Sequence, residues 1–261
     1  MPLIHLQGRL ICRSAEERRA VLTHLPLHIR LTLREPGCLL FDLAQGEDPM
    51  VWSVEEVFAS YAAYETHQKR SAQSDWGRAT LRIRRDYTLH EAPAQIAPET
   101  PADLRALYLL IRAAHGRAEE AELVGALRRT ATGAQGDLAA SLVARFGRAY
   151  LGHIALARLP GAAPCWLLGP ISLRESCRGQ GLGSALVQEA IAQARASGVV
   201  ALFALEPPGW LGRFGFQPAT GFQVPLAGES LSILRLNDLP LPAGPLTLPR
   251  AVLDYLTTLA A

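Results

Sequence analysis

The stretch Cys165-Trp-Leu-Leu-Gly-Pro-Ile-Ser-Leu-Arg-Glu-Ser-Cys-Arg-Gly-Gln-Gly-Leu-Gly-Ser-Ala-Leu186 decides the fold of the C-terminal part of this chain. Its first part is mostly apolar, which predicts a buried strand over residues 166–173. The run Gly179-Gln-Gly-Leu-Gly183 follows, and its glycines allow the backbone N–H groups of the turn to converge on an anion. Apolar residues at helical spacing then predict a helix that ends at Gly198. The stretch therefore predicts a strand, a phosphate-binding turn and a helix N-terminus, in that order.

The residues around the glycines exclude two other phosphate-binding turns. A Walker loop needs Lys and then Ser or Thr after its last glycine, but Leu182-Gly183-Ser184 stands there. A dinucleotide-binding turn needs the spacing G-x-G-x-x-G and an acidic residue on the next strand, which residues 199–204 lack. From the turn alone, an ordinary strand-to-helix connection without a ligand stays an open alternative.

The pattern Arg178-x-x-Gly181-x-Gly183 after an apolar strand resembles the coenzyme A pyrophosphate loop of the GNAT N-acetyltransferases. Downstream, Gly209-Trp-Leu-Gly-Arg-Phe-Gly-Phe-Gln-Pro218 resembles the segment that closes the domain in that family. Upstream, Thr100-Pro-Ala-Asp103 predicts a helix start, because Thr can cap a helix and Pro fits its first position. The resemblance covers about residues 94–237, including two expected helices (about 101–114 and 119–130) and two expected strands (142–145 and 149–159).

The GNAT resemblance implies a splayed mixed sheet and acetyl-CoA as the cosubstrate. Gly169 and Pro170 inside a strand predict a bulge, which separates this strand from residues 199–204 and opens a slot for the pantetheine arm. By resemblance, the strand backbone binds the arm, and the glycine turn surrounds the pyrophosphate. The residues assigned to acetyl-CoA in this way are Ile171, Ser172, Leu173, Arg178, Gly179, Gln180, Gly181, Leu182, Gly183 and Ser184.

The sequence departs from the GNAT pattern at the position of the usual general acid. GNAT relatives commonly carry a Tyr four residues before the Gly of Gly-Phe, where its hydroxyl protonates the leaving thiolate, but Leu211 stands there beside Trp210. Either another donor replaces it, or the domain binds acyl-CoA without turnover. Glu206 is the candidate general base, and a solvated loop acid is its alternative interpretation. Trp210 and Leu211 are expected near the acceptor.

The first third of the chain predicts a ferredoxin-like βαββαβ unit, so that the fold class of the whole chain is α+β. Alternation over residues 3–13 predicts a strand, and Ser14-Ala-Glu-Glu17 is a capping box for the next helix. Further strands are expected over 38–44, 50–58 and 79–90, with a helix over 60–72. Proline and alanine in Glu91–Pro98 mark the join, so we expect domains at 1–91 and 92–261.

The segments 35–41, 51–58 and 64–70, with Ser74-Asp-Trp76, resemble the antibiotic biosynthesis monooxygenase family, and the resemblance covers about residues 3–90. These small domains usually pair through their sheets, which implies a homodimer, and many oxidise quinol-like aromatics without a cofactor. Haem-degrading relatives use an Asn on the first strand, a Trp and then a later His. Here Gln7 stands on the first strand and His67 precedes Trp76, which speaks against haem.

A cofactor-free oxygenase needs a base and a hydrogen-bond donor that face a dry aromatic pocket. The candidates are His67 as the catalytic residue and Trp52, Trp76 and Arg84 as pocket residues. The alternative is that both tryptophans are core residues and that His67 only packs. His24 and His28 share a helix face, and a surface helix is the favoured interpretation over a metal site.

Composition limits the remaining functions. The chain has 261 residues and a net charge of +2, which argues against nucleic acid as a partner. We see no apolar run that could span a bilayer and no signal peptide, and the four cysteines form no C-x-x-C pair, so a cytoplasmic protein with reduced thiols is expected. The leading hypothesis is an acetyl-CoA-dependent N-acetyltransferase that acts on a small-molecule amine, with no metal, flavin or haem. The alternatives are an acyl-CoA-binding module without turnover and a cofactor-free oxygenase with an accessory GNAT domain.

Overall fold

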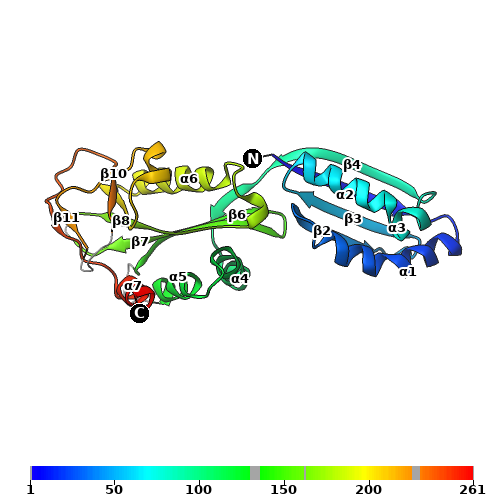
Figure 1. Cartoon of the computed structure of the whole chain (residues 1–261), viewed down its shortest axis with the longest axis horizontal. Helices are drawn as coiled ribbons and strands as arrows, with labels where there is room; N and C mark the ends of the chain where they lie inside the picture. Colours follow the sequence, from blue (N-terminus) through cyan, green and yellow to red (C-terminus); the bar gives the residue numbers. More distant parts are fainter. Residues whose placement is uncertain (1, 130–135, 162, 225–229, 261) are drawn as a thin grey trace. The chain divides into compact units, whose positions relative to one another are not determined.

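A computed structural model describes residues 2–129, 136–161, 163–224 and 230–260 of the chain. The chain divides into two compact units, and Figure 1 shows their elements. The first unit runs to Ala94 and includes Phe146–Ala149, and the second comprises Gln95–Arg145 and the chain from Tyr150 onward. In the described part of the chain, no helix is long and apolar enough to cross a membrane.

The N-terminal unit is a four-stranded antiparallel sheet with the order β2-β3-β1-β4. Its elements are β1 (Pro2–Ile11), α1 (Ala15–Thr32), β2 (Cys38–Gln45), β3 (Val51–Phe58), α2 (Tyr61–Gln73), α3 (Asp75–Ala79) and β4 (Arg84–Pro93). The predicted βαββαβ order is confirmed. The last strand begins later than predicted, because the Ser74 hydroxyl accepts a hydrogen bond from the Gly77 N–H and starts the short helix α3.

The C-terminal unit is built on a seven-stranded sheet with the order β10-β12-β9-β8-β7-β6-β5. β8 and β9 run parallel, whereas β10 with β12, β12 with β9, β5 with β6 and β7 with β8 are antiparallel, so this is the predicted mixed sheet. The strands are β5 (Gln95–Pro98), β6 (Leu138–Phe146), β7 (Ala149–Leu159), β8 (Cys165–Leu173), β9 (Ala201–Ala204), β10 (Gln217–Pro218) and β12 (Ser232–Arg235). Two short strands, β11 (Phe222–Gln223) and β13 (Gly244–Pro245), pair separately.

Helices cover both faces of this sheet. Figure 1 shows α6 (Leu182–Ala196) on one side, and α4 (Leu104–His115), α5 (Glu119–Arg129) and α7 (Arg250–Ala260) on the other. Three 3₁₀ turns connect the elements: η1 (Pro101–Asp103), η2 (Glu175–Cys177) and η3 (Gly209–Phe214). The Thr100 N–H donates to Asp103 Oδ2 at 2.7 Å, which confirms the capping motif predicted at this helix start.

The sheet is split between β8 and β9. The two strands pair only from Cys165 with Ala201 to Leu168 with Ala204, and β8 then continues to Leu173 paired with β7 but no longer with β9. The register of β8 against β7 shifts at the same place, because Leu156 pairs with Leu168 and Ile154 pairs with Ile171. Gly169 and Pro170 therefore form the predicted bulge, and the strands separate where it lies.

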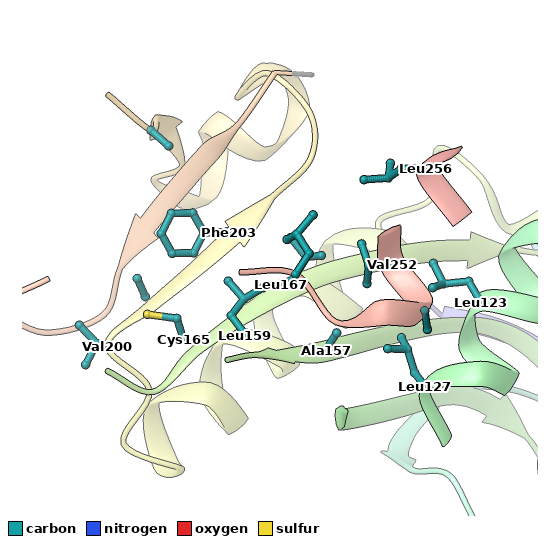
Figure 2. Packing of buried hydrophobic residues seen from close by; sticks show 14 residues of the cluster. Leu123, Leu127, Ala157, Leu159, Cys165, Leu167, Val200, Phe203, Val252 and Leu256 are labelled. Atoms are coloured by element: carbon teal, nitrogen blue, oxygen red, sulfur yellow. The ribbon is translucent and has the colours of Figure 1, made fainter. Parts of the chain in front are cut away.

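A continuous apolar core joins α5 and α7 to the sheet. Figure 2 shows Leu123 and Leu127 from α5 close to Val252 from α7 and Leu167 from β8. Each of these side chains is at least nine-tenths buried, and burial of one such side chain stabilises the fold by about 1.5–3 kcal/mol. This core fixes the C-terminal helix over the open end of the split.

Candidate functional site

A cavity of about 600 Å³ begins at the split between β8 and β9. Its wall includes β8 from Leu167 to Ile171 with Leu173, and Ala204 to Glu206 at the end of β9. Gly183 at the start of α6 and Trp210 in η3 line one end. The remaining residues come from α4, α5, β7 and α7: His115, Glu120, Leu123, Leu127, Ala157, Val252, Tyr255, Leu256 and Leu259. The cavity therefore passes from the side of α6 to the side covered by α4, α5 and α7.

The glycine turn is open where a ligand would lie. Gly179 and Gly181 have φ values of +72° and +86°, a conformation that side chains other than glycine adopt only with strain. Among the described residues, no atom lies within 4 Å of the point where a Cβ would sit on either glycine. Gly183 differs, because a Cβ there would lie 3.2 Å from Leu173 Cδ1. The first and second glycines therefore keep the turn open, and the third permits close packing on β8.

The side chains of the turn hold it in place. The Gln180 amide nitrogen donates to the Ser176 carbonyl at 2.8 Å, and Arg178 Nη2 donates to the Ala114 carbonyl at 2.5 Å. Burial raises the pKa of the Cys177 thiol, which packs beneath the turn and is a poor nucleophile. The first N–H groups of α6 have no hydrogen-bond acceptor within the helix. Together with the backbone N–H groups of the glycine turn, they are available to a ligand at this place. Arg178 and Gln180 thus shape a cradle made of main-chain donors.

The edge of β8 is exposed to the slot. Beyond Leu168 no described strand pairs with this edge, so backbone groups of Ile171–Leu173 are available to a ligand. The side chain of Ser172 is fully buried and its hydroxyl lies 3.0 Å from His115 Nε2. Ser172 can therefore contact a ligand in the slot only through its backbone N–H and C=O groups.

The acid and base candidates occupy different places. Glu206 lines the cavity just after β9, and burial raises its pKa. Trp210 also lines the cavity, with 41% of its surface exposed. Leu211 is 1% exposed and lies in the protein interior, outside the set of residues that form the cavity wall. The structure brings Glu206 and Trp210 to the slot and leaves Leu211 in the core.

Sequence reasoning missed a polar cluster on the side of α4, α5 and α7. Glu120 Oε1 accepts hydrogen bonds from the guanidinium of Arg117, at 2.9 Å from Nε, and from the Tyr255 hydroxyl at 3.0 Å. His115 Nδ1 lies 3.8 Å from the same oxygen. One signal was present: Glu120 shares a helix face with Leu123 and Leu127, and an acid on an apolar face is unusual.

This cluster has a fixed charge. Burial alone would raise the pKa of Glu120, but the Arg117 and Tyr255 hydrogen bonds outweigh it and lower the pKa below the ordinary value. Burial lowers the pKa of His115, and burial beside Glu120 raises the pKa of Tyr255 to about 12. At neutral pH the group therefore consists of a carboxylate, a neutral imidazole and a neutral phenol, with the Arg117 cation at the edge.

The N-terminal unit has its own cavity, of about 230 Å³. His67 and Trp76 both line it, whereas Trp52 is 2% exposed and belongs to the hydrophobic core. Arg84 is exposed, and its neighbour Arg85 lines the cavity in its place. The structure thus brings together two of the four residues predicted for this pocket.

Buried charged groups surround His67. Its Nδ1 lies 2.8 Å from Glu35 Oε2, and Arg70 Nε donates to Glu35 Oε1 at 2.6 Å. Glu56 Oε2 lies 3.8 Å from His67 Nε2 and has no hydrogen-bond partner among the described residues. Burial, with the nearby Glu35 carboxylate, raises the pKa of Glu56 to about 8.

His28 corrects a prediction. The favoured interpretation placed it on a surface helix face, but it is 4% exposed and stacks on Trp76 with ring centroids 4.7 Å apart. Burial lowers its pKa to about 3, so it is a neutral part of the cavity wall. In the described chain, no cluster of three or more His, Cys, Asp or Glu could hold a metal ion.

Comparison with known proteins agrees with this geometry. Residues 104–208 match the family profile described as "Acetyltransferase (GNAT) family", and residues 14–79 match that described as "Antibiotic biosynthesis monooxygenase". The solved GNAT family N-acetyltransferase YhbS from Escherichia coli, in complex with CoA, is 26% identical with a TM-score of 0.56, over 61% of this chain and 92% of that chain. A GNAT family acetyltransferase from Brucella melitensis, in complex with acetyl-CoA, is 28% identical with a TM-score of 0.52, over 61% of this chain and 97% of that chain. None of the curated proteins compared matches the chain.

The split sheet, the open glycine turn and the helix that follows have the arrangement of the GNAT fold. The chain carries a GNAT acetyltransferase domain, preceded by an antibiotic biosynthesis monooxygenase-like domain.

Proposed function

We propose that the C-terminal unit transfers the acetyl group of acetyl-CoA to the amine of a small molecule. The observation that carries this proposal is the split between β8 and β9, which leads directly to an open glycine turn at the start of α6. Two solved GNAT relatives hold CoA or acetyl-CoA, which supports the same cosubstrate here.

Acetyl-CoA is bound mainly by backbone groups in this proposal. The pantetheine arm lies along the free edge of β8 at Ile171, Ser172 and Leu173, and forms strand-like hydrogen bonds. The pyrophosphate lies on the turn and on the first N–H groups of α6, where the helix dipole favours negative charge. The residues in this second group are Arg178, Gly179, Gln180, Gly181, Leu182, Gly183 and Ser184.

The transfer needs a neutral amine and a protonated leaving group. Glu206 accepts a proton from the acceptor ammonium through water, and the amine nitrogen then attacks the thioester carbonyl carbon. A C–N bond forms, the C–S bond breaks, the nitrogen loses its second proton to water, and the thiolate takes up a proton. Leu211 has no proton to give, and we assign this proton to water, because the exposed Trp210 and Glu206 bring solvent to this end of the cavity. Binding both substrates in one slot removes most of the entropic barrier.

The test separates a transferase from a module that only binds acyl-CoA. Calorimetric titration with acetyl-CoA measures binding, and thiol release with a panel of amines measures transfer. A transferase binds and releases CoA only when an amine is present. Binding without release from any amine would leave an acyl-CoA-binding module, and absence of binding would overturn the proposal.

A second activity is proposed for residues 1–91, which we take as a domain separate from 92–261. Its cavity combines Glu56, a buried acid whose Oε2 has no hydrogen-bond partner among the described residues, with His67 and the aromatic wall at Trp76. Such a pocket suits a quinol-like aromatic, whose hydroxyl would donate to Glu56 when this carboxylate is ionised. We also propose that this domain pairs two chains in the cytoplasm. Oxygen uptake with hydroquinones tests oxidation, and loss of uptake in both Glu56→Gln and His67→Ala is expected. Sedimentation of the full chain tests dimerisation.

A further inference from the structure

We propose that Glu120 binds the ammonium group of the acceptor, and that the acceptor is a primary amine with a hydrophobic body. This inference rests on the proposed acetyltransferase function and assigns its substrate class. Three observations carry it: an unpartnered carboxylate oxygen, an apolar wall around it, and its place on the side of the slot opposite α6.

The first observation concerns the two oxygens of Glu120. Its side chain is 3% exposed, although it lies in the first turn of α5. Oε1 accepts hydrogen bonds from Arg117 and Tyr255, whereas Oε2 is buried without any hydrogen-bond partner in the described part of the chain. An unmet hydrogen bond at a buried polar group destabilises the protein. A ligand that donates hydrogen bonds with a positive charge satisfies this oxygen best.

The second observation concerns the wall. Most of the cavity surface on this side is aliphatic, and Figure 2 shows Leu123, Leu127, Val252 and Leu256 gathered near Leu167. None of the described residues that line the cavity is Lys or Arg, and two of them, Glu120 and Glu206, are acids. An acceptor that carried a carboxylate or phosphate on its body would meet leucine side chains and acids there. A cationic head with an apolar body fits both features.

The third observation separates the roles of the two acids. Glu120 belongs to α5, on the face of the sheet that α7 also covers, whereas Glu206 follows β9 at the split itself. Glu120 is held ionised by its partners, which suits an anion that binds a cation. Glu206 has a raised pKa, which suits a group that takes up a proton. The acceptor thus enters from the α5–α7 side, and its nitrogen keeps donating to Glu120 while Glu206 at the split takes one of its protons through water.

Tyr255 is a positioning residue in this site. Its hydroxyl holds Oε1 of Glu120 and so fixes the carboxylate, which forms part of the cavity wall. Replacement of Tyr255 by Phe keeps the aromatic wall and removes only this hydrogen bond. A positioning role predicts a higher KM with little change in kcat, because binding is lost equally in the ground state and the transition state.

The experiment measures CoA release by the full chain with acetyl-CoA and two probe amines, octylamine and 8-aminooctanoate. We expect octylamine to be the better acceptor by at least about 100-fold in kcat/KM, because the carboxylate of the second probe has to enter an apolar wall. Glu120→Gln should lower kcat/KM for octylamine by about 30–150-fold, the value of a charged hydrogen bond of about 2–3 kcal/mol. Tyr255→Phe should raise KM about 3–10-fold. The matched control, Glu122→Gln, changes an exposed acid on the same helix and should leave both values unchanged.

Calorimetry with acetyl-CoA keeps the two proposals distinguishable. If Glu120→Gln binds acetyl-CoA as the natural protein does but loses octylamine transfer, the inference holds. If the natural protein acetylates amines and both Glu120→Gln and Tyr255→Phe retain full kcat/KM, Glu120 is not the acceptor site, although the transferase function stands. Preference for 8-aminooctanoate over octylamine would overturn the assigned substrate class. Should Glu120→Gln fail to fold, Tyr255→Phe alone decides between these outcomes through its KM.

Discussion

Glu120 on α5 and Tyr255 on α7 are joined by a hydrogen bond of 3.0 Å, although 135 residues separate them in the chain. This contact makes the C-terminal helix part of the cavity wall. The same helix contributes Val252 and Leu256 to the core that packs on α5. Stability of α7 and the shape of the candidate acceptor site are therefore linked.

The first prediction concerns Gly181 and uses Gly198 as its control. Both glycines have positive φ, +86° and +70°, with open space around the position of a Cβ among the described residues. Alanine at either position should destabilise the protein by about 1–2 kcal/mol, because a side chain disfavours this conformation. Only Gly181→Ala should also weaken acetyl-CoA binding, by about tenfold or more, since Gly198 lies at the far end of α6. Chemical unfolding and calorimetry give the two values. Equal affinity for acetyl-CoA in both variants would show that the turn is not the pyrophosphate site.

The second prediction concerns Glu206 and pH. Burial raises its pKa, so the fraction of enzyme with an ionised base increases as the pH rises through that value. With an acceptor whose amine is ionised over the whole pH range, kcat should increase with pH and then level off, because Glu206 has to be ionised to take the ammonium proton. Glu206→Gln should lower kcat by about 10²–10⁴-fold and abolish this rise. Glu189→Gln on α6 is the control and should keep the profile. A pH profile that is unchanged in Glu206→Gln would assign the base elsewhere.

The third prediction concerns Leu211. If the family's usual tyrosine acted here in the usual way, Leu211→Tyr would raise kcat. The structure predicts the opposite, because Leu211 is buried in the interior and a larger polar side chain has no room there. We expect a loss of stability of about 1–3 kcal/mol and no gain in kcat. Thermal unfolding and thiol release measure the two effects. A faster enzyme with normal stability would place position 211 at the leaving thiolate.

The fourth prediction concerns Glu56 and the stability of the N-terminal unit. Its pKa is raised from 4.5 to about 8, so the folded state keeps a proton that the unfolded chain releases between these pH values. Stability from this group is therefore lost as the pH rises toward 8. His28, with a pKa lowered to about 3, is neutral in both states above pH 7 and adds nothing there.

The resulting change is measurable in a narrow pH window. Between pH 7 and pH 8 the free energy of unfolding of this unit should fall by about 1 kcal/mol, and Glu56→Gln should abolish this fall. Hydrogen exchange of peptides from β3, corrected for the intrinsic effect of pH, reports on this unit within the full chain. Identical pH dependence in Glu56→Gln and the natural protein would show that Glu56 is already ionised at pH 7.

Local signals predicted the elements that hold the candidate acetyl-CoA site. Gly169 and Pro170 predicted the bulge, because glycine and proline have strong backbone preferences that act within a few residues. Thr100 and Asp103 predicted the cap of the first C-terminal helix for the same reason. These features need no knowledge of distant contacts.

Residues whose role depends on tertiary packing were not predictable in the same way. Arg85 lines the N-terminal cavity and Arg84 does not, because successive side chains of a strand point to opposite faces and a shift of one residue changes the face. The pair of Glu120 and Tyr255 depends on where α7 packs, which no local pattern fixes. His28 is buried by the stacking of Trp76 from a separate helix.

A crystal structure of the full chain with acetyl-CoA tests the central claim most directly. We predict the diphosphate on the backbone N–H groups of residues 179–184 and the pantetheine arm along Ile171–Leu173, with the thioester at the split between β8 and β9. A diphosphate bound elsewhere, or β8 and β9 paired along their whole length around an empty turn, would contradict the account.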